Sequence, residues 1–293
     1  MEKALQNENL SIVVNSFGGA LSSIKDKEGT EYLWQGDKKY WSGQAPVLFP
    51  ICGSLRDDRA VIGEGKETCM PRHGIVRKKE FVLEKADGEE ISYSIAADES
   101  TLAQYPYDFK LVISYKLSGK AIEIKYTVEN RGAAVMPCFL GAHPGFNCPL
   151  TDDTVYEDYY LEFEQAEDCT AAVNLPDTGL VDRQSRQPFL QGTNRLPLDY
   201  KYFAVDAVTL DRLKSRKVRL ATEKHNKGIE VDFADFPYLI LWSTANKSPF
   251  IALEPWSGLS TCTDEGDVFE EKADVSLIEP LGKKEFKLRI SIL

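Results

Sequence analysis

The segment Ala121–Glu129 alternates strictly between apolar and polar side chains. Its apolar positions are Ile122, Ile124, Tyr126 and Val128. Successive side chains of a β-strand point to opposite faces, so this pattern predicts a strand with one buried and one exposed face. Half-buried strands of this kind are typical of antiparallel sheets, which restricts the chain to folds that contain such a sheet.

Similar short runs, rich in Val, Ile, Tyr and Phe, recur along the sequence and are separated by turn clusters such as Ala86–Gly88 and Leu117–Lys120. Helical periodicity is scarce, and only Ser100–Tyr105 and Asp206–Ser215 suggest a turn or two of helix. A long series of strands without helices between them favours an all-β fold, either a sandwich or a barrel. The other predicted strands are Ser11–Val14, Phe81–Glu84, Ile91–Ala97 and Lys110–Leu117.

Length and composition agree with this interpretation. The 293 residues contain no internal repeat, low-complexity tract or linker, so we expect residues 1–293 to form a single domain. The net charge of −11, without a basic stripe, argues against a nucleic-acid partner. The N-terminus lacks the pattern of a signal peptide, and no stretch approaches the ~18 apolar residues of a membrane span. We therefore expect a cytoplasmic protein without a membrane partner.

The six cysteines show no Cys-x-x-Cys pair and no zinc-like spacing. We expect them to be free thiols that pack as small apolar side chains. Cys52 and Cys148 lie near two histidine segments in the sequence, which keeps a thiol nucleophile as an alternative.

Two apolar runs, Tyr238–Trp242 and Phe250–Trp256, flank a polar turn and predict a β-hairpin. The second run contains one acid, Glu254, which alternation places on the same face as Phe250. Pro255 has no N–H to donate, so we expect strand pairing to end there, near a rim of the sheet. An exposed glutamate on an edge strand is the plainer alternative. A carboxyl group withdrawn from water by apolar neighbours has a raised pKa, however, and Glu254 is therefore the candidate base.

Only three histidines are present. His73 and His143 lie among Gly and Pro residues, where functional loops concentrate, whereas His225 lies in a polar segment typical of a surface turn. Together with Glu254 and Arg56, the first two histidines can be assembled into one site. One carboxylate and one or two imidazoles supply a base and an acid that both work near neutral pH.

Other chemistries find less support in the residues. No Gly-x-Ser-x-Gly segment is present for serine hydrolysis, and no second acid in a comparable setting completes the carboxylate pair of a glycosidase. Two histidines and one glutamate are enough for a metal site, but no His-Glu-x-x-His motif or close histidine pair supports one. A base and an acid without a nucleophile or metal suit an isomerisation that moves protons.

A family resemblance is carried by Glu31–Asp37, Pro46–Pro50, Arg72–Gly74, His143–Phe146, Leu213–Arg216 and Glu254–Trp256. These segments resemble the aldose 1-epimerase (galactose mutarotase) superfamily, and in particular its LacX-like branch. The likeness runs in the expected order from about Gly18 to the C-terminus. It implies a large antiparallel β-supersandwich with few short helices, no metal and no organic cofactor, and an open cleft for a monosaccharide.

The resemblance also implies roles for individual residues. Glu254 matches the family's general base and His143 its general acid, and the nearby carboxylate is expected to raise the pKa of His143. His73 matches the histidine that holds the sugar near its ring oxygen. Arg56 stands where the family has a substrate-binding Arg or Lys, with a shorter spacing to His73 than in the galactose enzymes.

The family's sugar-binding acid is assigned to Asp206, with Asp232 as the alternative. Ile75 stands where the branch usually has Phe after His-Gly, which bears on the wall of the cleft. The expected reaction is the interconversion of the α and β anomers of a free aldohexose by acid–base ring opening. The expected partner is a small monosaccharide, and the protein is expected to be a monomer or a homodimer.

Two alternatives to this reaction remain. A hexose-6-phosphate 1-epimerase needs extra cations at the cleft, and the arginines on either side of His73 in the sequence keep it open. The second alternative is a non-catalytic sugar-binding module, which does not require a matched acid and base. The arginines concerned are Arg56, Arg59, Arg72 and Arg77.

Overall fold

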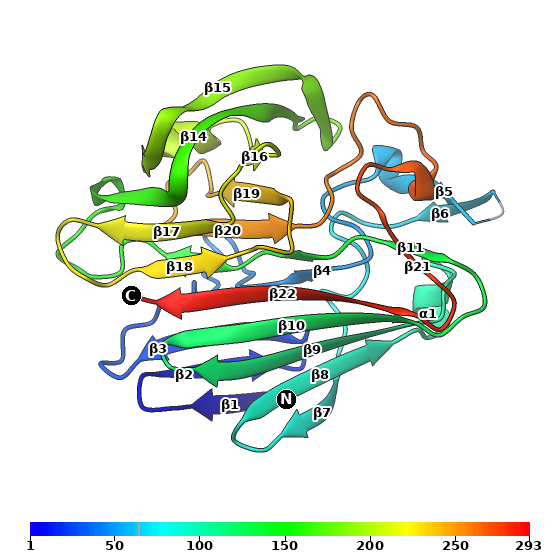
Figure 1. Ribbon diagram of the computed structural model, residues 1–293, viewed down its shortest axis with the longest axis horizontal. Coiled ribbons are helices and arrows are strands. Elements are labelled where there is room, and N and C mark those ends of the chain that lie inside the picture. Colours follow the sequence, from blue (N-terminus) through cyan, green and yellow to red (C-terminus); the bar gives the residue numbers. More distant parts are fainter. Residues whose placement is uncertain (64) are drawn as a thin grey trace.

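The computed structural model describes residues 1–63 and 65–293, and its elements are almost all β-strands (Figure 1). Fifteen strands join into one large sheet, and their order across it differs from their order along the chain. Its main path is β4 (Val47–Leu48), β12 (Gly141–Ala142), β20 (Phe250–Trp256), β19 (Tyr238–Trp242), β16 (Val208–Leu210), β14 (Tyr159–Leu175), β17 (Lys217–Thr222), β18 (Ile229–Asp232), β22 (Lys283–Ile292), β10 (Ala121–Asn130), β9 (Phe109–Ser118), β8 (Glu90–Ala96) and β7 (Val82–Ala86). The other two strands are β13 (Gly145–Asn147), which pairs with β20, and β15 (Leu180–Pro197), which pairs with β14.

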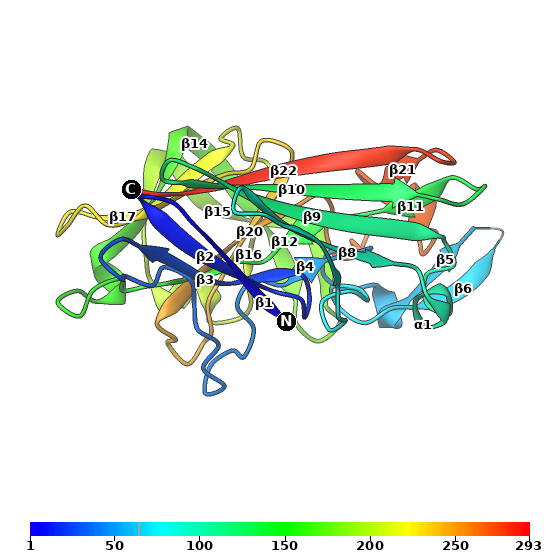
Figure 2. The ribbon, with the colours of Figure 1, turned by 90° about the horizontal axis from the view of Figure 1, so that it is seen from below.

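A separate three-stranded antiparallel sheet is formed by β1 (Glu2–Gln6), β2 (Leu10–Asn15) and β3 (Ala20–Asp26). Figure 2 shows it alongside β8 and β9, and β1 contacts both of these strands. The buried Tyr115 hydroxyl on β9 donates to the Gly19 carbonyl at 2.7 Å, which ties the two sheets together. The N-terminal strands thereby cover one face of the large sheet.

Two small strand pairs and short helices complete the fold. The pairs are β5 (Arg59–Ile62) with β6 (Lys66–Cys69) and β11 (Met136–Cys138) with β21 (Ser276–Ile278). The helices are α1 (Glu99–Leu102) and the 3-10 turns η1 (Arg56–Asp58), η2 (Tyr156–Asp158), η3 (Tyr200–Phe203) and η4 (Phe269–Glu271). Among the described residues, no helix is long and apolar enough to cross a membrane.

The antiparallel all-β fold predicted from alternation is confirmed. The predicted strand Ala121–Glu129 forms β10, which lies between β9 and β22 with Ile122 and Ile124 buried. The matching alternation on β22 buries Phe286 and Leu288 against the same core. The other four predicted strands correspond to β2, β7, β8 and β9 within two residues at each end.

Of the two predicted helical segments, one contains a helix and the other does not. Ser100–Tyr105 overlaps α1, because the Asp98 carboxylate accepts the Thr101 N–H at 2.8 Å and caps the helix. The helix predicted over Asp206–Ser215 is wrong. Its residues Val208–Leu210 form β16, which pairs with β19, so pairing in the sheet overrides the local preference.

The predicted hairpin is confirmed as β19 and β20, but the prediction that pairing stops at Pro255 is wrong. β20 continues to Trp256, and it is an interior strand rather than a rim, because β12 and β13 pair with its other edge. On that edge, the Leu253 N–H donates to the Pro144 carbonyl and the Ser257 N–H donates to the Leu140 carbonyl. The N–H that Pro255 lacks would point to this edge between those two hydrogen bonds, so the proline removes one bond without ending the pairing.

Candidate active site

Glu254 lies on one face of β20, an interior strand near one end of the large sheet. Alternation along β20 sends Phe250 and Ala252 to the same face, where they pack with Trp34, while Leu253 joins the main core on the other face. Only 1% of the surface of Glu254 is exposed, so the predicted withdrawal of this carboxyl group from water is nearly complete. The plainer alternative, an exposed glutamate on an edge strand, does not hold.

His143 is brought to Glu254 by an interruption in the neighbouring strand. Before the interruption Gly141 pairs with Trp256, and after it Gly145 pairs with Ala252, so the same register aligns His143 with Glu254. The His143 Nε2 and Glu254 Oε2 atoms are 3.2 Å apart. Two residues that are distant in sequence are therefore direct cross-strand neighbours.

His73 is held close to this pair by its own backbone. It adopts a left-handed conformation with φ of 69°, and its N–H donates to the Gly53 carbonyl at 2.7 Å. The next residue, Gly74, also has positive φ, and a Cβ there would lie 2.1 Å from the Phe49 carbonyl oxygen. Glycine is therefore required after His73. The His73 ring lies edge-on to His143, with 5.6 Å between ring centroids.

The protonation state of His73 follows from its contact with Gly53. The Gly53 N–H donates to His73 Nδ1 at 3.2 Å, so Nδ1 is unprotonated and the neutral ring carries its proton on Nε2. Burial lowers the pKa of His73 well below 6.5, and the charges of His143, Arg72 and Arg77 act in the same direction. His73 is therefore a neutral hydrogen-bond donor.

The three side chains line a cleft of about 280 Å³. Trp41 stacks on the His143 ring at 4.8 Å between centroids, and Trp242 meets the same ring edge-on at 5.6 Å. Aromatic walls of this kind offer flat apolar surfaces to the C–H face of a sugar ring. The lining residues are Trp41, Pro46, Arg72, His73, Arg77, His143, Asp206, Ala207, Ile240, Trp242, Glu254 and Trp256.

Several polar atoms of this cleft are buried without a hydrogen-bond partner among the described residues. They are His143 Nδ1, Trp256 Nε1 and Glu254 Oε2, whose 3.2 Å contact with His143 Nε2 lacks hydrogen-bond geometry, and they make up half of the six such side-chain atoms found in the described part of the chain. Buried polar groups are normally satisfied, so a concentration of unsatisfied ones indicates a place for a polar ligand.

Burial also determines how the His143–Glu254 pair holds protons. It raises the pKa of Glu254 well above 4.5, against the opposing effects of the Arg72 charge and the Trp256 indole. It lowers the pKa of His143 to about 3. The expectation that the carboxylate raises the pKa of His143 is therefore wrong, because loss of solvation outweighs attraction to a carboxyl group that itself resists ionisation. Burial thus favours the neutral forms of both groups, a carboxylic acid beside an imidazole.

The predicted acids and the predicted arginine lie in different places. Asp206 lines the cleft, whereas Asp232 on β18 pairs with Lys217 at 3.4 Å on the outer side of the sheet. Arg56 is not among the cleft-lining residues, because its guanidinium is held by Asp267 at 3.1 Å and by two backbone carbonyls. Ile75 is buried in the main core and does not line the cleft.

The arginines that do line the cleft are Arg72 and Arg77, which the sequence indicated only as flanking charges. Arg72 directly precedes His73, and Arg77 follows it after one apolar turn, so the loop that positions the histidine also delivers both cations. The motif around His73 was a usable signal. Arg72 and Arg77 lie close in sequence to His73, a candidate sugar-binding residue, whereas Arg56 does not.

The alternative of a thiol nucleophile loses its support. Cys52 and Cys148 are buried, and burial raises the pKa of both thiols, so neither forms a thiolate readily. All six cysteines are free, as predicted. Within residues 1–63 and 65–293, no group of three or more His, Cys, Asp or Glu side chains is arranged to hold a metal ion.

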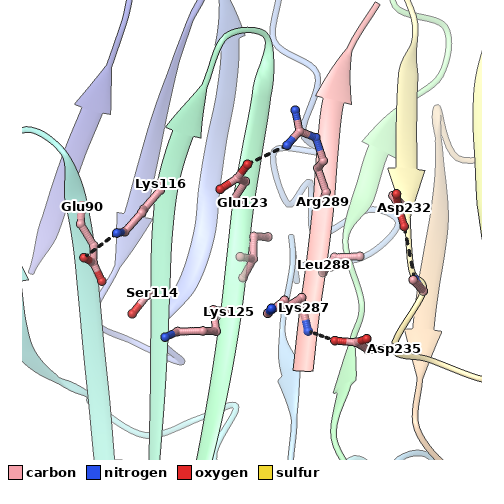
Figure 3. A pocket seen from close by; sticks show the side chains of 12 residues that line it. Glu90, Ser114, Lys116, Glu123, Lys125, Asp232, Asp235, Lys287, Leu288 and Arg289 are labelled. Carbon is pink, nitrogen blue, oxygen red and sulfur yellow. Dashed lines mark hydrogen bonds and ion pairs between the residues drawn. The ribbon is translucent and has the colours of Figure 1, made fainter. Parts of the chain in front are cut away.

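A larger hollow, of about 570 Å³, lies on the outer face of β10 and β22 (Figure 3). Four of its charges form two ion pairs: Lys116 pairs with Glu90 at 3.4 Å, and Arg289 pairs with Glu123 at 2.7 Å. Neither an aromatic side chain nor a histidine lines this hollow. It lacks the acid–base groups and the unsatisfied atoms of the cleft, which is the stronger candidate for a functional site.

The fold and the cleft agree with what comparison of the chain with known proteins shows. The chain belongs to the aldose 1-epimerase family, whose model matches residues 3–272. Proteins of this family act on sugars, and the resemblance predicted from the motifs is confirmed.

Individual relatives support the same family and fold. Protein LacX of Lactococcus lactis subsp. lactis, in both its plasmid and chromosomal versions, is 51% identical over 294 residues, which cover 99% of this chain and 98% of the relative. A galactose mutarotase related enzyme from Lactobacillus acidophilus has a TM-score of 0.93 at 26% identity, covering 100% of this chain and 97% of its own. A galactose mutarotase-like protein from Lactobacillus casei ATCC 334 has a TM-score of 0.92 at 28% identity, covering both chains completely.

Proposed function

We propose that this protein is an aldose 1-epimerase that interconverts the α and β anomers of an aldohexose. The observation that carries the proposal is the 3.2 Å approach of His143 Nε2 to Glu254 Oε2 inside the cleft. The two oxygens that exchange protons in this reaction, the C1 hydroxyl and the ring oxygen, are bonded to the same carbon. A base and an acid that serve them must therefore be close neighbours, as these two groups are.

The proposed reaction moves two protons and breaks one bond. Glu254, as the carboxylate, removes the proton of the C1 hydroxyl while His143, as the imidazolium, protonates the ring oxygen. The C1–O bond to the ring oxygen breaks and the C1–O bond of the former hydroxyl becomes the aldehyde carbonyl. Rotation about C1–C2 presents the other carbonyl face, and reversal of both transfers closes the opposite anomer.

The number of protons that the His143–Glu254 pair holds fits this cycle. The reactive form, carboxylate with imidazolium, has the same single proton as the resting form favoured by burial, neutral carboxylic acid with neutral imidazole. A polar sugar in the cleft replaces part of the lost solvation and brings the charged form within reach. Because the substrate supplies one proton and receives another, the pair returns to its starting state after each turnover.

Other cleft residues support substrate binding in this proposal. His73 Nε2–H donates to the sugar near its ring oxygen, and Asp206 accepts hydrogen bonds from sugar hydroxyls. Trp41 provides an apolar wall and fixes the orientation of the His143 ring. Arg56 has no role in this scheme, since Asp267 holds it elsewhere.

The test is a mutarotation assay by polarimetry on a panel of aldoses, with wild-type protein and Glu254→Gln. Each proton transfer is worth ~10²–10⁴-fold, so the variant should lose that factor in kcat while remaining folded. A matched control is Glu164→Gln, an exposed acid on β14 outside the cleft, which should keep wild-type kcat. Wild-type activity in Glu254→Gln contradicts the proposal. Sugar-dependent thermal stabilisation without any catalysed mutarotation indicates the binding module instead.

A further inference from the structure

Two arginines in the cleft have no counter-ion among the residues that the structure describes. Arg72 is exposed and Arg77 is half-buried, and neither makes an ion pair or a side-chain hydrogen bond within the described part of the chain. By contrast, Arg56 and Arg186 are both paired with acids, at 3.1 and 2.5 Å. A half-buried guanidinium group is normally paired, so Arg77, with Arg72 on the same loop, indicates a place where an anion can bind.

The charge balance of the cleft points the same way. The cleft's other ionisable side chains are His73, Asp206, His143 and Glu254, and burial favours the neutral forms of both histidines and of Glu254. Two guanidinium charges therefore face a single carboxylate, in a protein whose net charge is −11. The two arginines are close enough that the charge of Arg72 lowers the pKa of Arg77, in addition to the larger effect of burial. An anion between them relieves this repulsion.

We propose that the substrate of this cleft is an aldose that carries an anionic group at C6, a phosphate or a carboxylate, held by Arg72 and Arg77. This inference rests on the proposed epimerase function and specifies its substrate class. Guanidinium groups bind both anions through paired N–H donors, and such charge-assisted hydrogen bonds are stronger than those to neutral hydroxyls.

The position of the anion follows from the reaction and from the placement of the arginines. The anomeric hydroxyl must be free to ionise, so the anion cannot be attached at C1. Arg72 and Arg77 lie on the same loop as His73, within four residues of it, and line the cleft with it. The histidines serve the ring oxygen in the proposed reaction, and C5, which carries C6, is the ring carbon bonded to that oxygen opposite C1.

The test compares the catalysed anomer exchange of glucose, 6-deoxyglucose, glucose 6-phosphate and glucuronate by exchange NMR, in buffer free of phosphate and sulfate. The uncatalysed rate of each sugar is subtracted. We expect kcat/KM for at least one anionic sugar to exceed that for glucose by 10-fold or more, and the phosphate and carboxylate arms distinguish the two anions. In Arg77→Gln and in Arg72→Gln this ratio should fall at least 10-fold, and Arg77→Lys should retain part of it because it keeps the charge.

The matched control is Arg59→Gln, which removes an arginine that is 68% exposed and does not line the cleft. It should leave the ratio unchanged. Equal turnover of neutral and anionic aldoses, or a preference that survives both glutamine substitutions, overturns the inference and leaves the epimerase function standing. No catalysed exchange with any of the sugars contradicts the function itself, and the inference falls with it.

Discussion

At the scale of single residues, the central feature is that an acid and a base are buried side by side, with 3.2 Å between His143 Nε2 and Glu254 Oε2. Glu254 and His143 are both shielded from water by aromatic side chains, and burial shifts their pKa values in opposite directions. Such a pair resists both full protonation and full deprotonation. It therefore carries one mobile proton over a wide pH range, which is what repeated proton exchange with a substrate requires.

This protonation pattern predicts a broad bell-shaped dependence of kcat/KM on pH. Activity is lost on the acidic side when the pair takes up a second proton, and the lowered pKa of His143 puts that limb below pH 6.5. It is lost on the alkaline side when the pair releases its only proton, and the raised pKa of Glu254 puts that limb above pH 4.5. Initial rates between pH 3 and 10 test this. An acidic limb centred at 6.5, the ordinary histidine value, would show that His143 is not desolvated.

At the scale of elements, the site depends on a strand that is interrupted where it passes Glu254. β12 and β13 pair with the same edge of β20 on either side of the interruption, and His143 occupies it. Further from the cleft, the irregular segment before β17 is held by Glu167, a buried acid on β14. Its carboxylate accepts the Lys214 N–H at 3.1 Å and both the N–H and the hydroxyl of Ser215 at 2.6 Å.

The family segment around Lys214 is therefore structural, and Glu167→Ala should lower stability without changing kcat per folded molecule. Loss of these charge-assisted hydrogen bonds should cost about 1.5–3 kcal/mol in the free energy of unfolding, measured by urea titration. The control on the same strand is Glu164→Ala, an exposed acid that accepts only the Arg216 N–H, with an expected cost of about 0.5 kcal/mol or less. Equal costs for both variants would contradict this account.

The sequence was most informative where a strand is long and half-buried. Alternation located β10 closely, because its two faces differ in solvent exposure over ten residues. The helix predicted over Asp206–Ser215 failed because β16, only three residues long, is determined by its pairing with β19. Periodicity cannot reveal such short strands, and β12 and β13 are equally short.

The candidate site shows the same limit. The burial of Glu254 followed from its apolar neighbours, but its approach to His143 depends on a register between distant segments, and only family resemblance pointed to it. The position of Arg56 outside the cleft was not foreseeable for a related reason, since its partner Asp267 is 211 residues away in sequence. Ion pairs of that separation leave no local pattern.

At the scale of the whole molecule, an acidic protein encloses a cleft rich in cations and neutral histidines. Holding a histidine neutral inside the fold affects the stability of the entire molecule. The pKa of His73 is lowered by burial, so below pH 6.5 the unfolded chain binds a proton there that the folded protein does not. The contribution of His73 to stability is therefore fully present above pH 6.5 and is lost as the pH falls towards its folded-state pKa.

His73→Asn should remove this pH dependence, and asparagine tolerates the left-handed conformation at this position. The histidine of the unfolded chain is half-protonated at pH 6.5 and almost fully protonated at pH 5, so the wild-type free energy of unfolding should fall by up to about 1.6 kcal/mol more than that of the variant between these pH values. Urea titrations at both pH values supply the comparison. Identical slopes would mean that His73 is protonated in the folded protein.

The central claim, that His143 and Glu254 act as one acid–base unit on a sugar, is tested most directly by a double-mutant cycle. The catalysed anomer-exchange rate is measured for wild type, Glu254→Gln, His143→Gln and the double variant, on the aldose that the wild type converts fastest. Groups that act as a unit are not additive, so each single substitution should cost ~10²–10⁴-fold and the double variant should be about as slow as the slower single variant. Single variants that keep the wild-type rate, or losses that multiply as for independent residues, would contradict the account.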